Sequence, residues 1–246
     1  MANFIPLKNY ILFCIDKLIT SNGLQGPFLD VGCGRGDVSK FLSEQYGWHG
    51  KAIDISEEAV EHTKSFLAQN EYINVSKSTI HEETELYGVI LLLDVIEHIE
   101  NDFEILEKAN TLLNEQGAII ITVPSNPPEW RWDDEFYGHY RRYRAEDIRL
   151  SLEKAGFKVL TIWDFTYPVF WLMRRMYTFL KRPPKENDAI SQKTEKSSLR
   201  DAWAIPGISG LLQHENWLWR CLYKIQFKYF KENPSKGHEI IILGRK

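Results

Sequence analysis

The sequence predicts an α/β fold with a parallel sheet. Over the first half of the chain, short apolar runs alternate with segments of helical periodicity, which is the pattern of strands joined by crossover helices. A glycine loop follows the first apolar run directly. A chain of 246 residues with 43% hydrophobic side chains can bury one sizeable core, so we expect one domain.

The elements are expected in the following order. A first helix is expected at 7–20, where apolar residues recur at helical spacing before a Ser-Asn-Gly turn at 21–23. The short apolar runs predict strands at 27–31, 51–55, 72–78, 88–93, 117–124, 157–163 and 238–243. Helices are expected at 37–46, 56–68, 102–113 and 145–155. Asp37 and Ser56 are expected to cap two of these helices, and Gly156 to end the last.

The connection between the last two strands is too long for an ordinary α/β loop. It contains two segments that combine aromatic and basic residues, at 167–182 and 216–231. The polar run between them, 183–198, is expected to be flexible. We interpret the connection as a helical insertion within a single domain. The expected parts are an N-terminal helix (1–24), a core (25–165), the insertion (166–236) and the last strand (237–246).

Charge is distributed unevenly along the chain. The formal net charge is −4, but residues 1–165 sum to −12 and residues 166–246 to +8. An acidic body argues against a general nucleic-acid binder, and the split suggests that the two parts meet different partners.

The same sequence limits the compartments we expect. Three widely spaced cysteines indicate neither a disulfide framework nor a zinc site. No signal peptide and no membrane-spanning run is expected. We therefore expect a cytoplasmic protein, with peripheral attachment to a membrane as a further expectation.

The glycine loop lies in the segment 28–37, Phe-Leu-Asp-Val-Gly-Cys-Gly-Arg-Gly-Asp. Gly32, Gly34 and Gly36 permit a tight turn and let a nucleoside ligand approach the backbone. The carboxylate of Asp30, beside the loop, suits a cationic ammonium group better than a pyrophosphate. Asp54 ends the second strand, where it can accept hydrogen bonds from two ribose hydroxyls.

A dinucleotide site is the alternative to this interpretation. NAD sites use G-x-G-x-x-G, whereas this chain has G-x-G-x-G and places Asp37 where the third glycine would fall. A carboxylate at a helix N-terminus competes with pyrophosphate for the positive end of the helix dipole. The loop therefore favours a nucleoside ligand without a pyrophosphate.

At this point the chain resembles the class I S-adenosylmethionine-dependent methyltransferases. The resemblance rests on LDVGCGRGD (29–37), KAIDIS (51–56), LLLDVIEHI (91–99), GAIIITVPS (117–125) and AGF (155–157). It implies a doubly wound, mostly parallel, seven-stranded Rossmann-like sheet with a reversed final hairpin, and S-adenosyl-L-methionine as the cofactor. In two places the chain departs from the family pattern: it has Ser78-Thr79 where an acid often reaches the adenine, and Gly88 where an Asp often opens the fourth strand.

The resemblance also implies a set of cofactor-binding residues. Asp30 and the loop would flank the methionine end, Asp54 would hold the ribose, and Asp94 would lie near the methionine end and the acceptor. The full predicted set is Asp30, Gly32, Cys33, Gly34, Gly36, Asp37, Asp54, Ile55, Asp94 and Val95.

The segment 126–143 follows the fifth strand, at the sheet edge where ligands of such folds bind. Its GHYRRY string is similar to a motif in a subset of small-molecule and lipid-pathway methyltransferases. His139 is a candidate general base for a hydroxyl acceptor, and Arg141 a candidate clamp for an anionic group. Alternatively, His139 anchors the loop and the arginines neutralise Asp133, Asp134 and Glu135.

Two further groups of residues are candidate sites. For Glu97 and His98 we favour a place in the pocket wall or a packing role over catalysis. For the acidic run 133–135 with His139 we favour a solvated loop over a metal site, and no metal is expected.

The insertion is interpreted as a lid over the substrate, with contact to an anionic membrane surface or an acidic carrier protein as further hypotheses. Nucleic acid is the weakest partner. We therefore predict an S-adenosylmethionine-dependent methyltransferase that acts on oxygen of a small or lipid-like molecule. A non-catalytic adenosylmethionine-binding module is the alternative.

Overall fold

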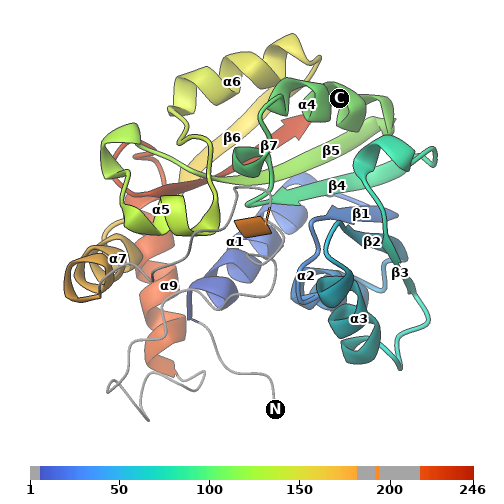
Figure 1. Cartoon of the computed structure of the whole chain (residues 1–246), viewed down its shortest axis with the longest axis horizontal. Coiled ribbons are helices and arrows are strands. Elements are labelled where there is room, and N and C mark those ends of the chain that lie inside the picture. The colour runs from blue at the N-terminus through green and yellow to red at the C-terminus, as the bar shows by residue number, and fades with distance from the viewer. Residues whose placement is uncertain (1–5, 182–191, 194–216) are drawn as a thin grey trace.

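A computed structural model describes residues 6–181, 192–193 and 217–246. It shows one seven-stranded sheet in the order β3-β2-β1-β4-β5-β7-β6, flanked by helices on both faces (Figure 1). The strands are β1 (Phe28–Val31), β2 (Gly50–Asp54), β3 (Ile73–Lys77), β4 (Tyr87–Leu93), β5 (Leu113–Pro124), β6 (Lys158–Asp164) and β7 (Glu239–Arg245). The predicted fold class is confirmed.

The sheet is parallel except at its last strand. Strand β7 enters antiparallel between β5 and β6, which forms the reversed hairpin that the family resemblance implies. Strand β4 is the centre of the sheet and is buried on both faces, so its sequence is a continuous apolar run rather than an alternating one.

Helices cover the two faces in separate groups (Figure 1). Their bounds are α1 (Pro6–Asn22), α2 (Asp37–Tyr46), α3 (Glu57–Phe66), α4 (Asp102–Thr111), α5 (Trp132–Tyr137), α6 (Ala145–Lys154), α7 (Val169–Leu180) and α9 (Trp217–Phe230). Residues of α1, α2, α7 and α9 share one core cluster with the sheet, and residues of α4 and α6 share the other.

The predicted helix caps differ in outcome. Ser56 caps α3, because its side chain accepts a hydrogen bond from the Ala59 amide, as expected. The cap predicted at Asp37 is wrong, since Gly36 occupies the N-cap and Asp37 is the first helical residue. The Asp37 carboxylate pairs instead with Lys8 of α1.

The helices of the long connection pack on the body of the molecule. Tyr10 of α1 stacks against Phe170 of α7 at 5.6 Å and Tyr223 of α9 at 5.0 Å between ring centroids. The Tyr223 hydroxyl also donates to the Pro6 carbonyl at 2.7 Å. This aromatic cluster favours the predicted organisation as one domain. Most of the polar run predicted to be flexible lies outside the described residues.

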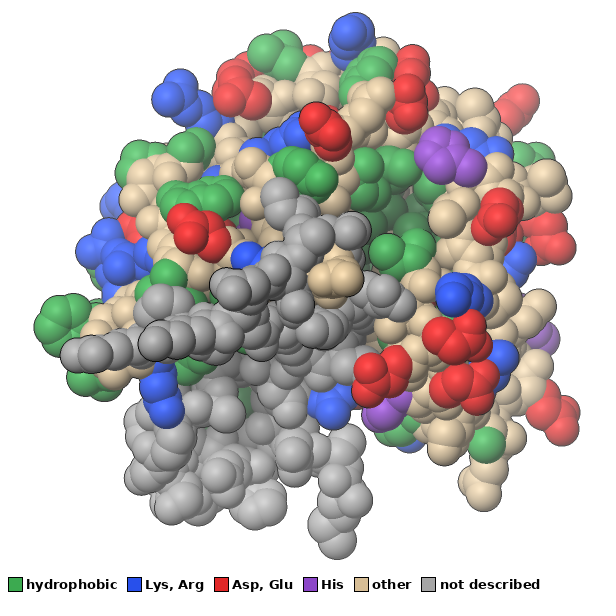
Figure 2. All heavy atoms as spheres, viewed as in Figure 1, with side chains coloured by type: hydrophobic (Ala, Val, Ile, Leu, Met, Phe, Trp, Pro, Cys, Tyr) green, Lys and Arg blue, Asp and Glu red, His purple; other side chains and the backbone are tan. Residues whose placement is uncertain are grey.

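Charge is also segregated on the surface. Asp and Glu side chains gather over α2 and α3, whereas Lys and Arg side chains flank α7 (Figure 2). None of the helices in the described part of the chain is long and apolar enough to cross a bilayer.

Candidate functional site

A cavity of about 590 Å³ opens at the carboxyl ends of β1, β2 and β4. The strand order reverses between β1 and β4, so the crevice lies at the switch point where α/β sheets bind ligands. Most of the predicted cofactor residues line it: Asp30, Gly32, Cys33, Gly34, Asp54, Ile55, Asp94 and Val95. Gly36 and Asp37 are not among the lining residues.

The glycine loop has a backbone that other residues would not tolerate. Gly32 has φ 71°, and a Cβ there would lie 2.7 Å from Cγ2 of Val95. Gly36 has φ 77°, and a Cβ there would lie 2.6 Å from Cγ2 of Thr63. Gly36 therefore serves the packing of the loop on α3, while Gly32 lies on the cavity wall.

Two buried carboxylates flank this loop. Asp30 is 2% exposed and accepts a hydrogen bond from Ser39 Oγ at 2.6 Å. Burial raises the pKa of Asp30 to about 6. Asp54 accepts hydrogen bonds from the amides of Gly34 and Ser56, at 3.0 and 2.9 Å, so its orientation is fixed against the loop.

Asp94 follows β4 with a left-handed backbone, φ 54°, which is uncommon for a residue other than glycine. Its side chain accepts a hydrogen bond from Thr122 at 2.8 Å and lines the cavity. Desolvation by the surrounding cavity wall raises the pKa of the Asp94 carboxyl. A strained backbone beside a carboxylate that lines a cavity is a common feature of functional sites.

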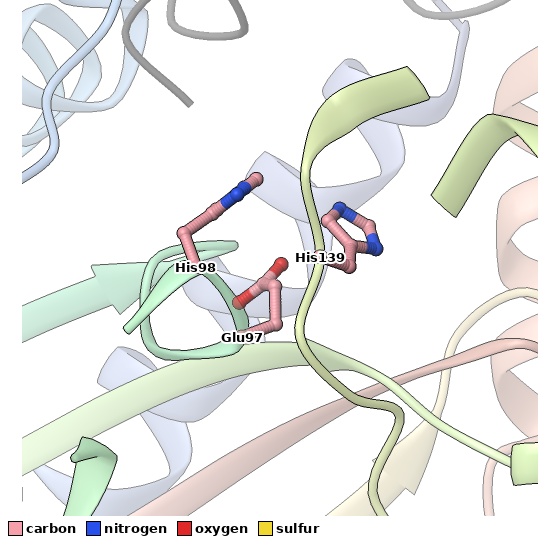
Figure 3. A group of neighbouring side chains, drawn as sticks. All are labelled: Glu97, His98 and His139. Atoms are coloured by element: carbon pink, nitrogen blue, oxygen red, sulfur yellow. The ribbon is translucent and has the colours of Figure 1, made fainter. Parts of the chain in front are cut away.

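His139, Glu97 and His98 meet at the same cavity (Figure 3). Glu97 and His98 lie in a 3₁₀ turn (Ile96–His98), and His139 follows the end of α5. The two imidazole rings meet edge to face, with centroids 4.8 Å apart. Burial and the neighbouring His139 lower the pKa of His98 to about 3, so that ring is neutral near pH 7.

Asp134 of α5 orients His139, since the two side chains are 3.0 Å apart between Oδ1 and Nδ1. Burial opposes ionisation of Asp134, but the hydrogen bond from His139 and the charge of Arg142 hold the pKa of this carboxyl well below its usual range. Arg142 and Arg174 both lie 2.8 Å from Asp134. The imidazole is therefore held by a carboxylate that stays ionised.

Asp133 and Asp134 of the acidic run before His139 are buried and only Glu135 is exposed, which corrects the expectation of a solvated loop. It forms α5, and Arg174 of α7 contacts Asp133 through two hydrogen bonds of 2.8 and 2.6 Å. The sequence offered no signal for this pairing, because the partners are 41 residues apart.

Of the two arginines of the GHYRRY segment, only Arg142 lines the cavity. Arg141 is not among the cavity-lining residues; it contacts Asp102 at 3.1 Å and the Glu100 carbonyl. Arg142 lines the cavity and is buried. Arg174, from the predicted lid, also lines the cavity, while α9 contributes no lining residue.

A family model described as "Methyltransferase domain" matches residues 8–162. The chain belongs to this methyltransferase family. It is an S-adenosylmethionine-dependent methyltransferase of class I, and S-adenosyl-L-methionine is its cofactor.

Individual relatives support this assignment. The chain is 25% identical over 223 residues to a phosphoethanolamine N-methyltransferase of Plasmodium falciparum, covering 82% of each chain. It is 35% identical over 98 residues to a ubiquinone biosynthesis O-methyltransferase of Rickettsia canadensis, covering 39% of this chain and 41% of the relative. Its fold resembles that of the magnesium protoporphyrin IX methyltransferase of Synechocystis PCC 6803 with bound cofactor (TM-score 0.52, 20% identity, 67% and 76% coverage).

The cavity fits the cofactor of this family. Gly32 has no side chain, so its backbone faces the cavity directly, and a Cβ at this position would collide with Val95. Asp30 supplies a carboxylate for an ammonium group, and Asp54 one for hydroxyl groups. The apolar side chains Ile55 and Ile80 supply a surface for a flat aromatic ring.

Proposed function

We propose that this methyltransferase acts on a hydroxyl oxygen of a small or lipid-like acceptor. The observation that carries the proposal is the Asp134–His139 pair on the wall of the cavity that also contains the glycine loop. When bound, S-adenosylmethionine supplies a methyl group on a positively charged sulfur. A neutral hydroxyl is a weak nucleophile, so a nearby group that assists loss of its proton speeds the transfer.

The residues around the loop would hold the cofactor. Asp30 would accept hydrogen bonds from the ammonium group, and Asp54 would accept them from the ribose hydroxyls. Their positions near the carboxyl ends of the neighbouring strands β1 and β2 support this division, because both carboxylates then line the cavity beside the glycine loop.

His139 would activate the acceptor. Its Nδ1 faces ionised Asp134, so Nδ1 carries the proton and Nε2 offers a lone pair. In the simplest form of the proposal, Nε2 takes the acceptor proton directly. Asp134 then stabilises the resulting cation, as an orienting carboxylate does in other acid–base pairs.

The test must distinguish methyl transfer to oxygen from methyl transfer to nitrogen, because the relatives include enzymes of both kinds. One is an N-methyltransferase and the other an O-methyltransferase. The acceptor panel therefore contains matched hydroxyl and amine compounds, including phenols, lipids with hydroxyl groups and ethanolamine derivatives. Transfer to amines but not to hydroxyls would overturn the proposal of O-methylation.

His139→Ala tests the role of the imidazole. We expect the transfer rate to fall by roughly 10²–10⁴-fold, because general-base assistance is lost. Calorimetry should show unchanged binding of S-adenosylmethionine. His81→Ala is the matched control, since His81 lines the same cavity but lies outside this cluster. A nearly normal rate in His139→Ala would make His139 a structural residue.

Contact with an anionic membrane is the second part of the proposal. Large apolar side chains on α7 and α9 are exposed, including Phe179 at 86% and Trp217 at 72%. Basic residues of the insertion accompany them, and this combination suits an interface with anionic lipid. We expect the protein to co-sediment with vesicles that contain anionic lipid at low salt. The double variant Phe179→Glu/Trp217→Glu should no longer co-sediment. Leu150→Glu, at an exposed position of α6, is the control and should leave co-sedimentation unchanged.

A further inference from the structure

We propose that Glu97, His98 and His139 form a binding site for a divalent transition-metal ion of the zinc class. One ligand atom from each residue lies within 4.8 Å of the others. The Glu97 carboxylate points toward the space between the two imidazole rings (Figure 3). The three side chains come from two segments about 40 residues apart in the sequence, the turn after β4 and the turn after α5.

Glu97 is the first argument for an ion. Its side chain is 0% exposed, and neither carboxylate oxygen has a hydrogen-bond partner among the described residues. A buried carboxylate without a partner destabilises a protein, so its presence on a cavity wall calls for a ligand. Burial and the nearby charge of Asp94 also raise the pKa of Glu97. A bound cation would offset both effects.

The orientation of the histidines is the second argument. Nδ1 of His98 lies 3.3 Å from the Gly138 carbonyl, and Nδ1 of His139 lies 3.0 Å from Asp134. Both partners accept hydrogen bonds, so each Nδ1 carries the proton and each Nε2 carries a lone pair. Metal-binding histidines are held in this way, with one ring nitrogen donating to a carbonyl or carboxylate and the other binding the ion.

The choice of ion follows from the donor set. Two imidazole nitrogens and one carboxylate suit Zn²⁺ and similar transition metals, whereas Mg²⁺ and Ca²⁺ prefer oxygen ligands. Ligand atoms around tetrahedral zinc lie about 3.3 Å apart, so small side-chain rotations would close the site. Three protein ligands leave a fourth position open, and all three residues line the cavity in which the acceptor would bind.

This inference rests on the proposed function and changes the role of His139 within it. Nε2 would bind the ion instead of the proton. An acceptor hydroxyl at the open position would lose its proton to water more readily, because a bound cation lowers the pKa of a coordinated hydroxyl. The oxygen would then form its bond to the methyl carbon while the carbon–sulfur bond breaks and its electron pair stays on sulfur.

The test measures metal binding without requiring turnover. The full chain is treated with a chelator, dialysed, and titrated with Zn²⁺ by calorimetry and with Co²⁺ by visible absorption. We expect one equivalent to bind and Glu97→Gln to weaken binding by at least about tenfold. Because the Glu97 carboxylate has no hydrogen-bond partner, this isosteric variant should fold with an unchanged or higher melting temperature. His81→Asn is the control and should bind the ion as the wild type does.

Two results would overturn the metal site. One is the absence of stoichiometric binding to the wild-type chain, and the other is equal affinity in the wild type and Glu97→Gln. If the chain binds no metal but binds ethanolamine, and Glu97→Gln abolishes that binding, the Glu97 carboxylate is a site for an amine instead. Calorimetry with S-adenosylmethionine on the same samples separates these outcomes from failure of the proposed function, because the carboxylates assigned to the cofactor, Asp30 and Asp54, are not among the proposed metal ligands.

Discussion

Asp30 is a buried carboxyl whose protonation we expect to control cofactor affinity. It is almost inaccessible to solvent, Ser39 donates one hydrogen bond to it, and burial raises its pKa to about 6. Only the ionised carboxylate can form charge-assisted hydrogen bonds with the ammonium group of S-adenosylmethionine. Affinity should therefore fall as the pH drops through the range around 6.

The size of the effect follows from this pKa. At pH 7 the carboxyl is about nine-tenths ionised, and at pH 5 about one-tenth. An α-amino group keeps its proton over this range, because its pKa is about 7.7–8.0. The dissociation constant should thus rise about tenfold between pH 7 and pH 5, and binding at pH 6 should release about half a proton.

The same shift affects the ligand-free protein in the opposite direction. The pKa of Asp30 is higher in the folded chain than in the unfolded chain, so the folded state binds more protons between about pH 4 and pH 6. Stability therefore falls as pH rises through that window, by roughly 3 kcal/mol for this group. Asp30→Asn should remove this cost and raise the melting temperature at pH 7.

Calorimetry at pH 5, 6 and 7, in buffers of different ionisation enthalpy, measures both affinity and proton release. Asp30→Asn should bind the cofactor more weakly and with no dependence on pH. Ser39→Ala should move the midpoint to higher pH, because it removes a hydrogen bond that favours the ionised form. A wild-type affinity that is constant from pH 5 to 7 would refute the reasoning, as would full affinity in Asp30→Asn.

Two further predictions concern the ribose contact and the packing of the insertion. Asp54→Ala should weaken cofactor binding about 5- to 150-fold, since two hydrogen bonds of about 0.5–1.5 kcal/mol each are lost; unchanged affinity in calorimetry would remove Asp54 from the site. Phe170→Ala should lower the free energy of unfolding in urea by about 3–5 kcal/mol, because the buried ring stacks on Tyr10. Phe179→Ala, at an exposed position of the same helix, should change it by less than about 0.5 kcal/mol. Equal losses in both variants would contradict an aromatic core shared with α1.

Most of the sheet could be predicted because its signals are local. Strand β4 is buried on both faces, so burial itself produces a continuous apolar run that is visible in the sequence. Helix α3 could be placed because Ser56 caps it through a residue three positions away. Helix α5 could not, because it has only 6 residues and its buried Asp133 is held by Arg174, far along the chain.

The candidate site also contains some residues that could be predicted from the sequence and others that could not. The residues predicted to bind the cofactor follow consecutive strands, and parallel strands bring their carboxyl ends to one edge of the sheet. Glu97 lines the cavity, in agreement with the expected place in the pocket wall. The ion pairs of Arg142 and Arg174 with Asp134, and the lack of a hydrogen-bond partner for Glu97 among the described residues, could not be predicted, because they depend on how α5 and α7 dock.

The sequence by itself determined the α/β class, the family and the acidic edge that faces the cofactor, because these depend on residue order within strand–loop–helix units. Only the tertiary structure decided which residues the basic side chains of the insertion contact. Arg174 pairs with the buried acids of α5, and Arg175 contacts Glu129, so part of the excess positive charge neutralises the acidic body. It also decided that Glu97, His98 and His139 share one wall of the cavity, since contacts between segments 40 residues apart are set by helix docking and leave no local pattern.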